Sequence, residues 1–228
     1  MLTQTRCRQL FLAIGTFLIL AGPLAEASRA DFTLTGTQQL TITGITYASA
    51  NGYLYNQSRA SLVSGGYVEN LYAYDTSTVN VTGGNANLVE ANGNSSVNFS
   101  SGLVAQLGTL GAGAVCNVTG GTIGCVLDNG GAVNLSGGSF STHGWLAAEA
   151  GTTIFYAKNF QLGPGLSLSG DRVLGTGTLS GKWAGGTAWS VSIVENDPGA
   201  TILEAPEPAT LGLVGIGLAG LLLRRKGK

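Results

Sequence analysis

Charged side chains are scarce in this chain. Only 10% of its 228 residues are charged, and it has a single histidine. The few cations are also segregated, because seven of the eleven lie before residue 31 or after residue 205. The stretch between holds four basic and ten acidic residues, a formal charge of −6. Since nucleic-acid binding requires clustered cations that neutralise phosphates, we expect no nucleic-acid partner.

The residue types that carry most enzyme chemistry are equally sparse. A lone histidine without cysteine or carboxylate at ligand spacing makes a poor metal site, and no G-x-S-x-G motif surrounds a serine. Two pairs of carboxylates recur 21 residues apart, Glu69 with Glu90 and Asp128 with Glu149. Such pairs could serve a small polysaccharide lyase or hydrolase, but the cations that a lyase also needs are few. We expect no metal, no cofactor and no enzymatic activity, with that enzyme as the less favoured alternative.

Glycine is the residue type in clear excess. It makes up 37 of 228 residues, about twice its ordinary usage. No Gly-X-Y period is present, which excludes collagen. Together with abundant Thr, Val and Asn, the glycines favour exposed β-structure with many turns.

A repeat of about 18 residues runs through the middle of the chain. Its copies are VNVTGG at 79–84, VNFSSG at 97–102, CNVTGG at 116–121 and VNLSGG at 133–138. Alternation places Val79 and Val81 on one side of a strand and Asn80 and Thr82 on the other. One such unit cannot bury its apolar side alone, whereas stacked units build a continuous core.

The repeat predicts an all-β fold, a single-stranded β-solenoid (parallel β-helix) with coils of about 18 residues. It resembles the β-solenoid repeats of autotransporters. An antiparallel β-sandwich with similar hairpins is the alternative. We expect ladders of stacked asparagines at 80, 98, 117 and 134 and of Ser or Thr at 82, 100, 119 and 136. Residues 31–194 would form this domain, with a C-terminal β cap from about residue 162 that protects the open edge, and residues 195–205 a linker.

Residues 1–30 have the three parts of a signal peptide. Arg6 and Arg8 precede an apolar run at residues 10–21, which is too short to span a membrane as a stable helix. Small residues then offer cleavage by signal peptidase after Ala27 or Ala30. We expect an exported protein with a short helix in this segment.

The carboxy-terminal segment also has three parts. Pro206, Glu207 and Pro208 come first, followed by an apolar stretch at residues 209–223. As a helix this stretch would be about 22 Å long, short of a hydrocarbon core of about 30 Å. A basic stop follows, and the positive-inside rule keeps it cytoplasmic. Its residues are Arg224, Arg225 and Lys226.

This arrangement resembles the PEP-CTERM sorting signal of Gram-negative bacteria. The resemblance implies processing by an exosortase, a membrane transpeptidase, with Pro206, Glu207 and Pro208 as its recognition motif. It also implies transient residence in the inner membrane and a host that makes exopolysaccharide. We therefore expect a secreted or cell-surface structural protein of the extracellular matrix, associated with exopolysaccharide.

Two further sets of residues are candidates for sites. Cys116 and Cys125 flank one Gly-Gly corner in an oxidising compartment, so they form either a disulfide or two buried thiols. Tyr47, Tyr53 and Tyr55 could stack on sugar rings, although strand tyrosines are more often half-buried packing. The tyrosines support the alternative function, a carbohydrate-binding or adhesive module.

Overall fold

The computed structural model describes residues 30–205. The expected sorting signal, the signal peptide up to residue 29 and the short helices of both termini lie outside the described residues. The described chain consists of strands and turns, and it contains no helix long and apolar enough to cross a membrane. The strands are β1 (Phe32–Leu34), β2 (Gln39–Ile42), β3 (Tyr47–Leu54), β4 (Arg59–Leu62), β5 (Tyr67–Ala73), β6 (Thr78–Asn92), β7 (Ser96–Leu110), β8 (Val115–Asn129), β9 (Ala132–Ala148), β10 (Thr152–Leu162), β11 (Leu166–Ser169), β12 (Arg172–Gly175), β13 (Gly177–Trp183), β14 (Ala188–Asn196) and β15 (Thr201–Ala205).

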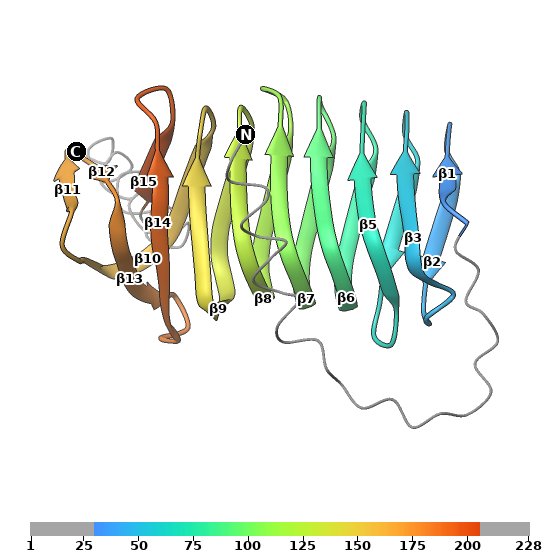
Figure 1. Ribbon diagram of the computed structural model, residues 1–228, viewed down its shortest axis with the longest axis horizontal. Coiled ribbons are helices and arrows are strands. Elements are labelled where there is room, and N and C mark those ends of the chain that lie inside the picture. Colours follow the sequence, from blue (N-terminus) through green and yellow to red (C-terminus); the bar gives the residue numbers. More distant parts are fainter. Residues whose placement is uncertain (1–29, 206–228) are drawn as a thin grey trace, which may run out of the picture.

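Successive coils stack along one axis, as the row of strands in Figure 1 shows. One stack of parallel strands contains β2, β4, the first halves of β6 to β9, and β10. The other contains β1, β3, β5, the second halves of β6 to β9, and β14. The protein is therefore a β-solenoid of about seven turns, as the repeat predicts, and the antiparallel sandwich is excluded.

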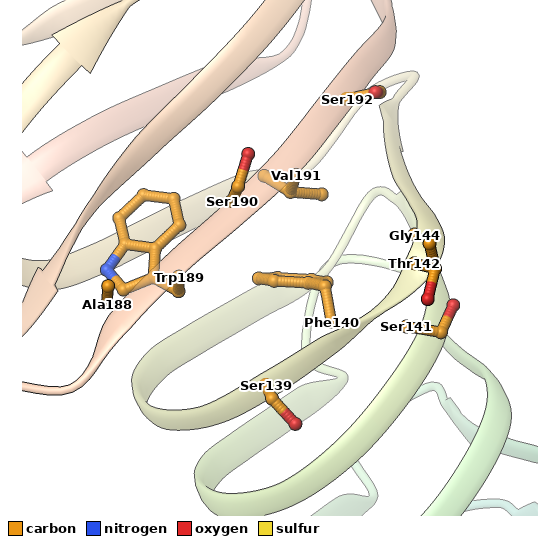
Figure 2. A pocket seen from close by; sticks show the side chains of 10 residues that line it. All are labelled: Ser139, Phe140, Ser141, Thr142, Gly144, Ala188, Trp189, Ser190, Val191 and Ser192. Atoms are coloured by element: carbon orange, nitrogen blue, oxygen red, sulfur yellow. The ribbon is translucent and has the colours of Figure 1, made fainter.

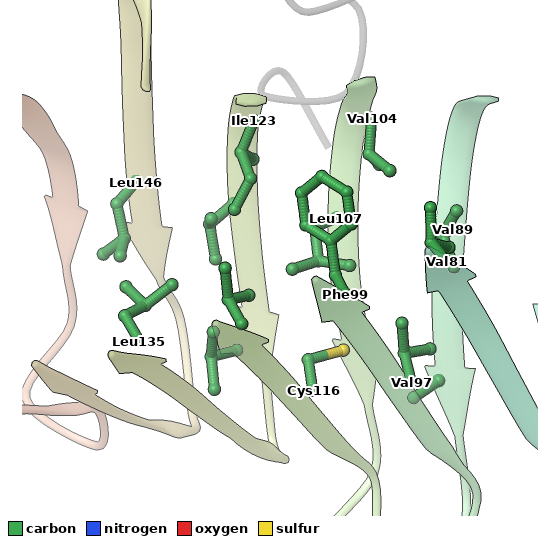
Figure 3. Close-up of a cluster of buried hydrophobic side chains, with 14 of the residues drawn as sticks. Val81, Val89, Val97, Phe99, Val104, Leu107, Cys116, Ile123, Leu135 and Leu146 are labelled. Carbon is green, nitrogen blue, oxygen red and sulfur yellow. The ribbon is translucent and has the colours of Figure 1, made fainter. Parts of the chain in front are cut away.

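The core lies between the two stacks. Alternate residues in the first half of β6 point inward, and the valines of the VNVTGG-type repeats are fully buried there. Figure 3 shows Val97 and Phe99 of one stack facing Val89 and Leu107 of the other. Because each coil repeats the same apolar positions, the core is continuous along the axis.

The expected asparagine ladder is present. From the second asparagine of the ladder onward, each side-chain amide donates to the side-chain carbonyl of the asparagine in the preceding coil, at 2.9–3.1 Å between heavy atoms. These residues are Asn80, Asn98, Asn117 and Asn134. A second ladder, which the repeat did not reveal, joins Asn51, Asn70 and Asn87 on the other stack.

The expected Ser/Thr ladder is wrong at two of its three steps. Thr82 pairs with Ser101 and Thr119 with Gly137, because the register shifts immediately before Thr82 and Thr119, next to the Gly-Gly corners that follow them. The hydroxyls of Ser100 and Ser136 instead donate to backbone carbonyl oxygens of the preceding coil, at 3.4 and 3.1 Å. The irregular Gly-Gly corners that turn the chain thus break the side-chain stacking next to them.

An antiparallel cap closes the C-terminal end, as expected. β13 pairs antiparallel with β10 and β14, and β12 pairs antiparallel with β11 and β15. Its interior is a stack of rings in which Trp189 lies 4.8 Å from Phe155 and 4.9 Å from Trp183, between ring centroids. The cap therefore has an aromatic core of its own, continuous with that of the coils.

The linker expected at residues 195–205 is wrong. β14 extends to Asn196, Pro198 and Gly199 lie in a turn, and β15 then adds to β10 in parallel. Ala200 and Ile202 are fully buried. The Pro-Gly pair that indicated a flexible segment forms a tight connection, because burying Ile202 and pairing β10 stabilise the returning strand.

Candidate binding cleft

The structure brings the candidate tyrosines into stacks with rings of the neighbouring coil. Tyr53 stacks on Tyr72 with 5.4 Å between centroids, and Tyr55 stacks on Tyr74 with 5.0 Å. Tyr47 packs against the ring of Phe32 at 4.8 Å. One face of Tyr53 and of Tyr55 is therefore covered by another ring and is not available to a sugar. Glycan contact through these three tyrosines stays a prediction.

Cys116 and Cys125 are not joined to each other by a disulfide. Cys116 is a free, fully buried thiol whose Sγ donates to the carbonyl of Gly108 at 3.3 Å. It pairs with Val97 in one stack of strands, whereas Cys125 pairs with Gln106 in the other. The Gly-Gly corner separates the two cysteines onto different stacks instead of bringing them together. Burial raises the pKa of the Cys116 thiol, so it is unreactive in the folded protein.

One of the two carboxylate pairs, Asp128 with Glu149, does not share a cleft. Asp128 points into the core, where the hydroxyls of Thr109 and Thr153 donate to its carboxylate at 2.7 and 2.9 Å. Glu149 is half-buried and lies just after Ala148, which pairs with Asp128. Burial raises the pKa of both carboxyl groups. Asp128 is thus a structural side chain that solvent does not reach.

Glu69 and Glu90 lie in neighbouring coils on β5 and β6. Glu90 pairs with Tyr72, and Glu69 lies between Val68 and Asn70, which pair with Ala86 and Leu88. The two glutamates are therefore offset by three residues along the strand direction. Burial raises the pKa of Glu90, and a hydrogen bond with Asn92 opposes that shift. Residues 30–205 contain no group of three or more His, Cys, Asp or Glu that could hold a metal ion.

A bulge in β9 creates a concave feature beside the cap. Along β8, Ile123 and Cys125 are two residues apart, whereas their partners on β9, Phe140 and Trp145, are five apart. Four residues, 141–144, therefore lie opposite the single residue 124, and these three extra positions form a bulge that includes the exposed His143. On its other side β9 meets β14 only from Trp145 onward, where Trp145 pairs with Ser192. Before that pair the two strands diverge.

The diverging strands enclose a cleft of about 400 Å³. Figure 2 shows Phe140, Ser141 and Thr142 of β9 on one side and Ser190 and Val191 of β14 on the other. The cleft lies open to solvent between them. Its lining consists of Ser139, Phe140, Ser141, Thr142, Gly144, Ala188, Trp189, Ser190, Val191 and Ser192.

The cleft has a firm frame at both ends. The indole N–H of Trp183 donates to the carbonyl of Gly138 at 2.7 Å and ties the cap to β9. At the other end the pairing of Trp145 with Ser192 closes the gap. The ring of Phe140 contacts that of Trp189, with 6.5 Å between centroids, and Trp189 is held in the aromatic stack of the cap.

The sequence contains one indication of this cleft, which is an unusually long step between equivalent positions of two successive coils. The step from Cys116 to its counterpart Val133 is 17 residues, but the step from Val133 to Thr153 is 20. The longer step contains the bulge. Its partner β14 could not be foreseen from the repeat, because that strand returns from the cap to pair with β9 in parallel.

The stacked parallel coils define the described part of this chain as a β-solenoid domain. The segment that follows is similar to a known sorting signal, because residues 204–226 match the PEP-CTERM protein-sorting motif. The match includes the predicted Pro206, Glu207 and Pro208 and the basic stop, which lie outside the described residues. No curated protein and no solved structure matches the chain. The motif indicates an exosortase target that is exported to the surface or extracellular space of a Gram-negative bacterium.

Proposed function

We propose that this protein is a structural component of the cell surface or extracellular matrix, associated with exopolysaccharide and without enzymatic activity. One observation carries the proposal: the sorting motif follows the solenoid without an intervening linker. The match begins at Glu204, within β15, and β15 pairs with β10 in the body of the fold. A molecule attached after processing would therefore be joined to a rigid rod.

The surface of the rod supports a matrix role. The amides of its asparagine ladders can donate to and accept from the hydroxyls of a hydrated polysaccharide. Its low density of charge limits electrostatic interactions with other matrix polymers. Both features favour contacts with a neutral polymer.

The processing half of the proposal is tested in a host with and without its exosortase. An antibody against the folded domain would follow size and location. We expect a shortened form at the surface or in the matrix of the competent host, and a longer form in the inner membrane of the deletion host. Substituting Pro206, Glu207 and Pro208 by alanine should reproduce the deletion. Equal sizes and locations in both hosts would contradict exosortase processing.

The proposed association with exopolysaccharide needs a separate comparison. In a host that has the exosortase but makes no exopolysaccharide, the processed protein should move from the matrix fraction into the medium. An unchanged distribution would reject the association with exopolysaccharide while leaving exosortase processing intact.

A carbohydrate-binding or adhesive module is the second candidate function. The hydroxyl-lined cleft between β9 and β14 favours it, since the cleft is concave and has both polar and apolar surface. A small lyase or hydrolase is less favoured, because Asp128, one of its candidate carboxylates, is buried in the core.

A further inference from the structure

We infer that the cleft between β9 and β14 binds a short neutral saccharide segment. This inference rests on the proposed association with exopolysaccharide and gives it a specific site. The chemistry of the lining is the first argument. Hydroxyl groups stand on both sides, Ser141 and Thr142 from β9 and Ser190 from β14, and each can donate and accept a hydrogen bond. The hydroxyls around the edge of a sugar ring likewise both donate and accept hydrogen bonds.

The apolar part of the cleft suits the remaining surface of a sugar ring. Phe140 adds an apolar side chain to the β9 wall, and the largely buried Val191 adds one to the β14 wall (Figure 2). The C–H groups on the face of a pyranose are apolar and pack against such side chains, which adds area burial to the hydrogen bonds. A lining with hydroxyls alone would compete poorly with water for a sugar.

Charge selects a neutral saccharide. None of the ten lining residues is charged. A uronate or a phosphorylated sugar would lose hydration of its anion on entering and gain no cationic partner, which costs free energy. The formal charge of −6 for residues 31–205 opposes anions further. The ligand is therefore expected from neutral stretches of a polysaccharide.

The shape of the cleft favours a compact ligand over an added β-strand. Its volume of about 400 Å³ lies at the lower end of the range for small-molecule sites. The pairing of Trp145 with Ser192 closes one end, so an extended peptide could not continue along the edge of β9. The anchored frame is also preformed, which limits the entropy lost on binding.

The test uses the protein purified from whichever cell fraction holds it, processed or not. The probes are the neutral and the acidic oligosaccharides obtained by partial hydrolysis of the host's own exopolysaccharide, and a hexapeptide of serine, threonine and valine. Saturation-transfer NMR and calorimetric titration report binding. We expect the neutral oligosaccharides to bind and the acidic oligosaccharides and the peptide to bind at least tenfold more weakly.

Variants then locate the site. Ser141→Leu and Ser190→Leu fill the cleft from its two walls and should each weaken binding of the neutral fraction at least tenfold. Ser169→Leu, at an exposed serine of β11 outside the lining, should leave it unchanged. Thermal unfolding of all three variants shows whether the fold is retained.

Three results would overturn the inference: no binding of the neutral fraction, binding that both cleft variants retain, or preferred binding of the acidic fraction or the peptide. These outcomes are independent of the tests in cells. Loss of exosortase processing would leave binding by the purified protein intact, and an empty cleft would leave processing and surface location intact.

Discussion

Asp128 places a carboxyl group in a row of small inward-facing side chains. The row follows the strand register of successive coils and consists of Ala73, Ala91, Thr109, Asp128 and Ala148. Space for the carboxyl is left by Gly151, where a Cβ atom would collide with it. Its hydrogen bonds with Thr109 and Thr153 connect three coils near the start of the cap. They offset part of the cost of burying the group.

Asp128 should make stability depend on pH. Burial raises its pKa in the folded protein above the ordinary value of 3.8. Its contribution to stability is therefore fully present below about pH 3.8 and is lost as pH rises toward the raised pKa, by about 1.4 kcal/mol for each pH unit that separates the folded from the unfolded pKa. Asp128→Asn, which stays neutral, should lack this loss. Urea unfolding of both proteins between pH 3 and pH 7 measures the difference.

The comparison of the two proteins isolates Asp128 from other carboxyl groups. Glu90 and Glu149 also have raised pKa values, but they contribute equally to both proteins. If the two free energies of unfolding run parallel across this range, Asp128 titrates alike in the folded and unfolded chain, and burial does not govern it.

The contacts of a residue could be predicted from the sequence where the residue recurs in successive coils, but not where it occurs once. The asparagine ladder followed from four equivalent positions, and each of its hydrogen bonds is present. The pairing of Cys116 with Cys125 rested on proximity in sequence alone. A corner between the two cysteines sends the chain from one stack to the other, which sequence distance does not reveal. The environment of Asp128 depends on three coils and was equally hidden.

At the scale of elements, the corners set the coil geometry through glycine. Gly102 has φ of 101°, and a Cβ atom there would collide with the Gly84 carbonyl oxygen of the preceding coil. Close stacking of the backbones therefore requires the absence of a side chain as well as the left-handed conformation. Gly36 has φ of 62° but open space around it, so it requires the conformation alone.

The two glycines allow strain and collision to be separated. Gly102→Ala should lower the free energy of unfolding by on the order of 3 kcal/mol, since it adds a backbone collision to the strain of a left-handed residue. Gly36→Ala should cost about 1 kcal/mol, the strain alone. Urea unfolding monitored by circular dichroism gives both values. Equal losses would mean that the corner at Gly102 relaxes away from Gly84, and that coil stacking there is not close-packed.

The repeat correctly predicted the coils in the middle of the chain. Its period and its alternation of apolar and polar residues both indicate stacked strands there. It failed where an element departs from the period. Asn56 and Asp75 adopt the left-handed conformation at corners where later coils have Gly93 and Gly111, so these two coils share the geometry without sharing the glycine. The bulge in β9 likewise came from three extra residues, and its consequence, the cleft, depends on a strand from the cap.

At the scale of the whole molecule, the rigid body reaches the sorting motif. The returning strand β15 pairs with β10 on one side and with β12 on the other, which makes it an interior strand of the cap. Arg172 adds hydrogen bonds to the carbonyls of Pro198 and Ala200 just before it. The sequence indicated the sorting motif through its three parts, whereas composition around Pro198 suggested a linker and concealed this strand.

The position of β15 predicts which truncation the domain tolerates. A chain of residues 31–205 should unfold with the same urea midpoint as one of residues 31–228 in the same mild detergent, because every strand from β1 to β15 remains. A chain of residues 31–200 should lose at least about 3 kcal/mol, since it removes the buried Ile202 and leaves the β10 and β12 edges unpaired. Were both truncated chains equally stable, β15 would contribute nothing to the fold. The expected result means that cleavage at Pro206, Glu207 and Pro208 takes place as close to the folded body as it can without removing a strand, so the protein is released or attached with its cap complete.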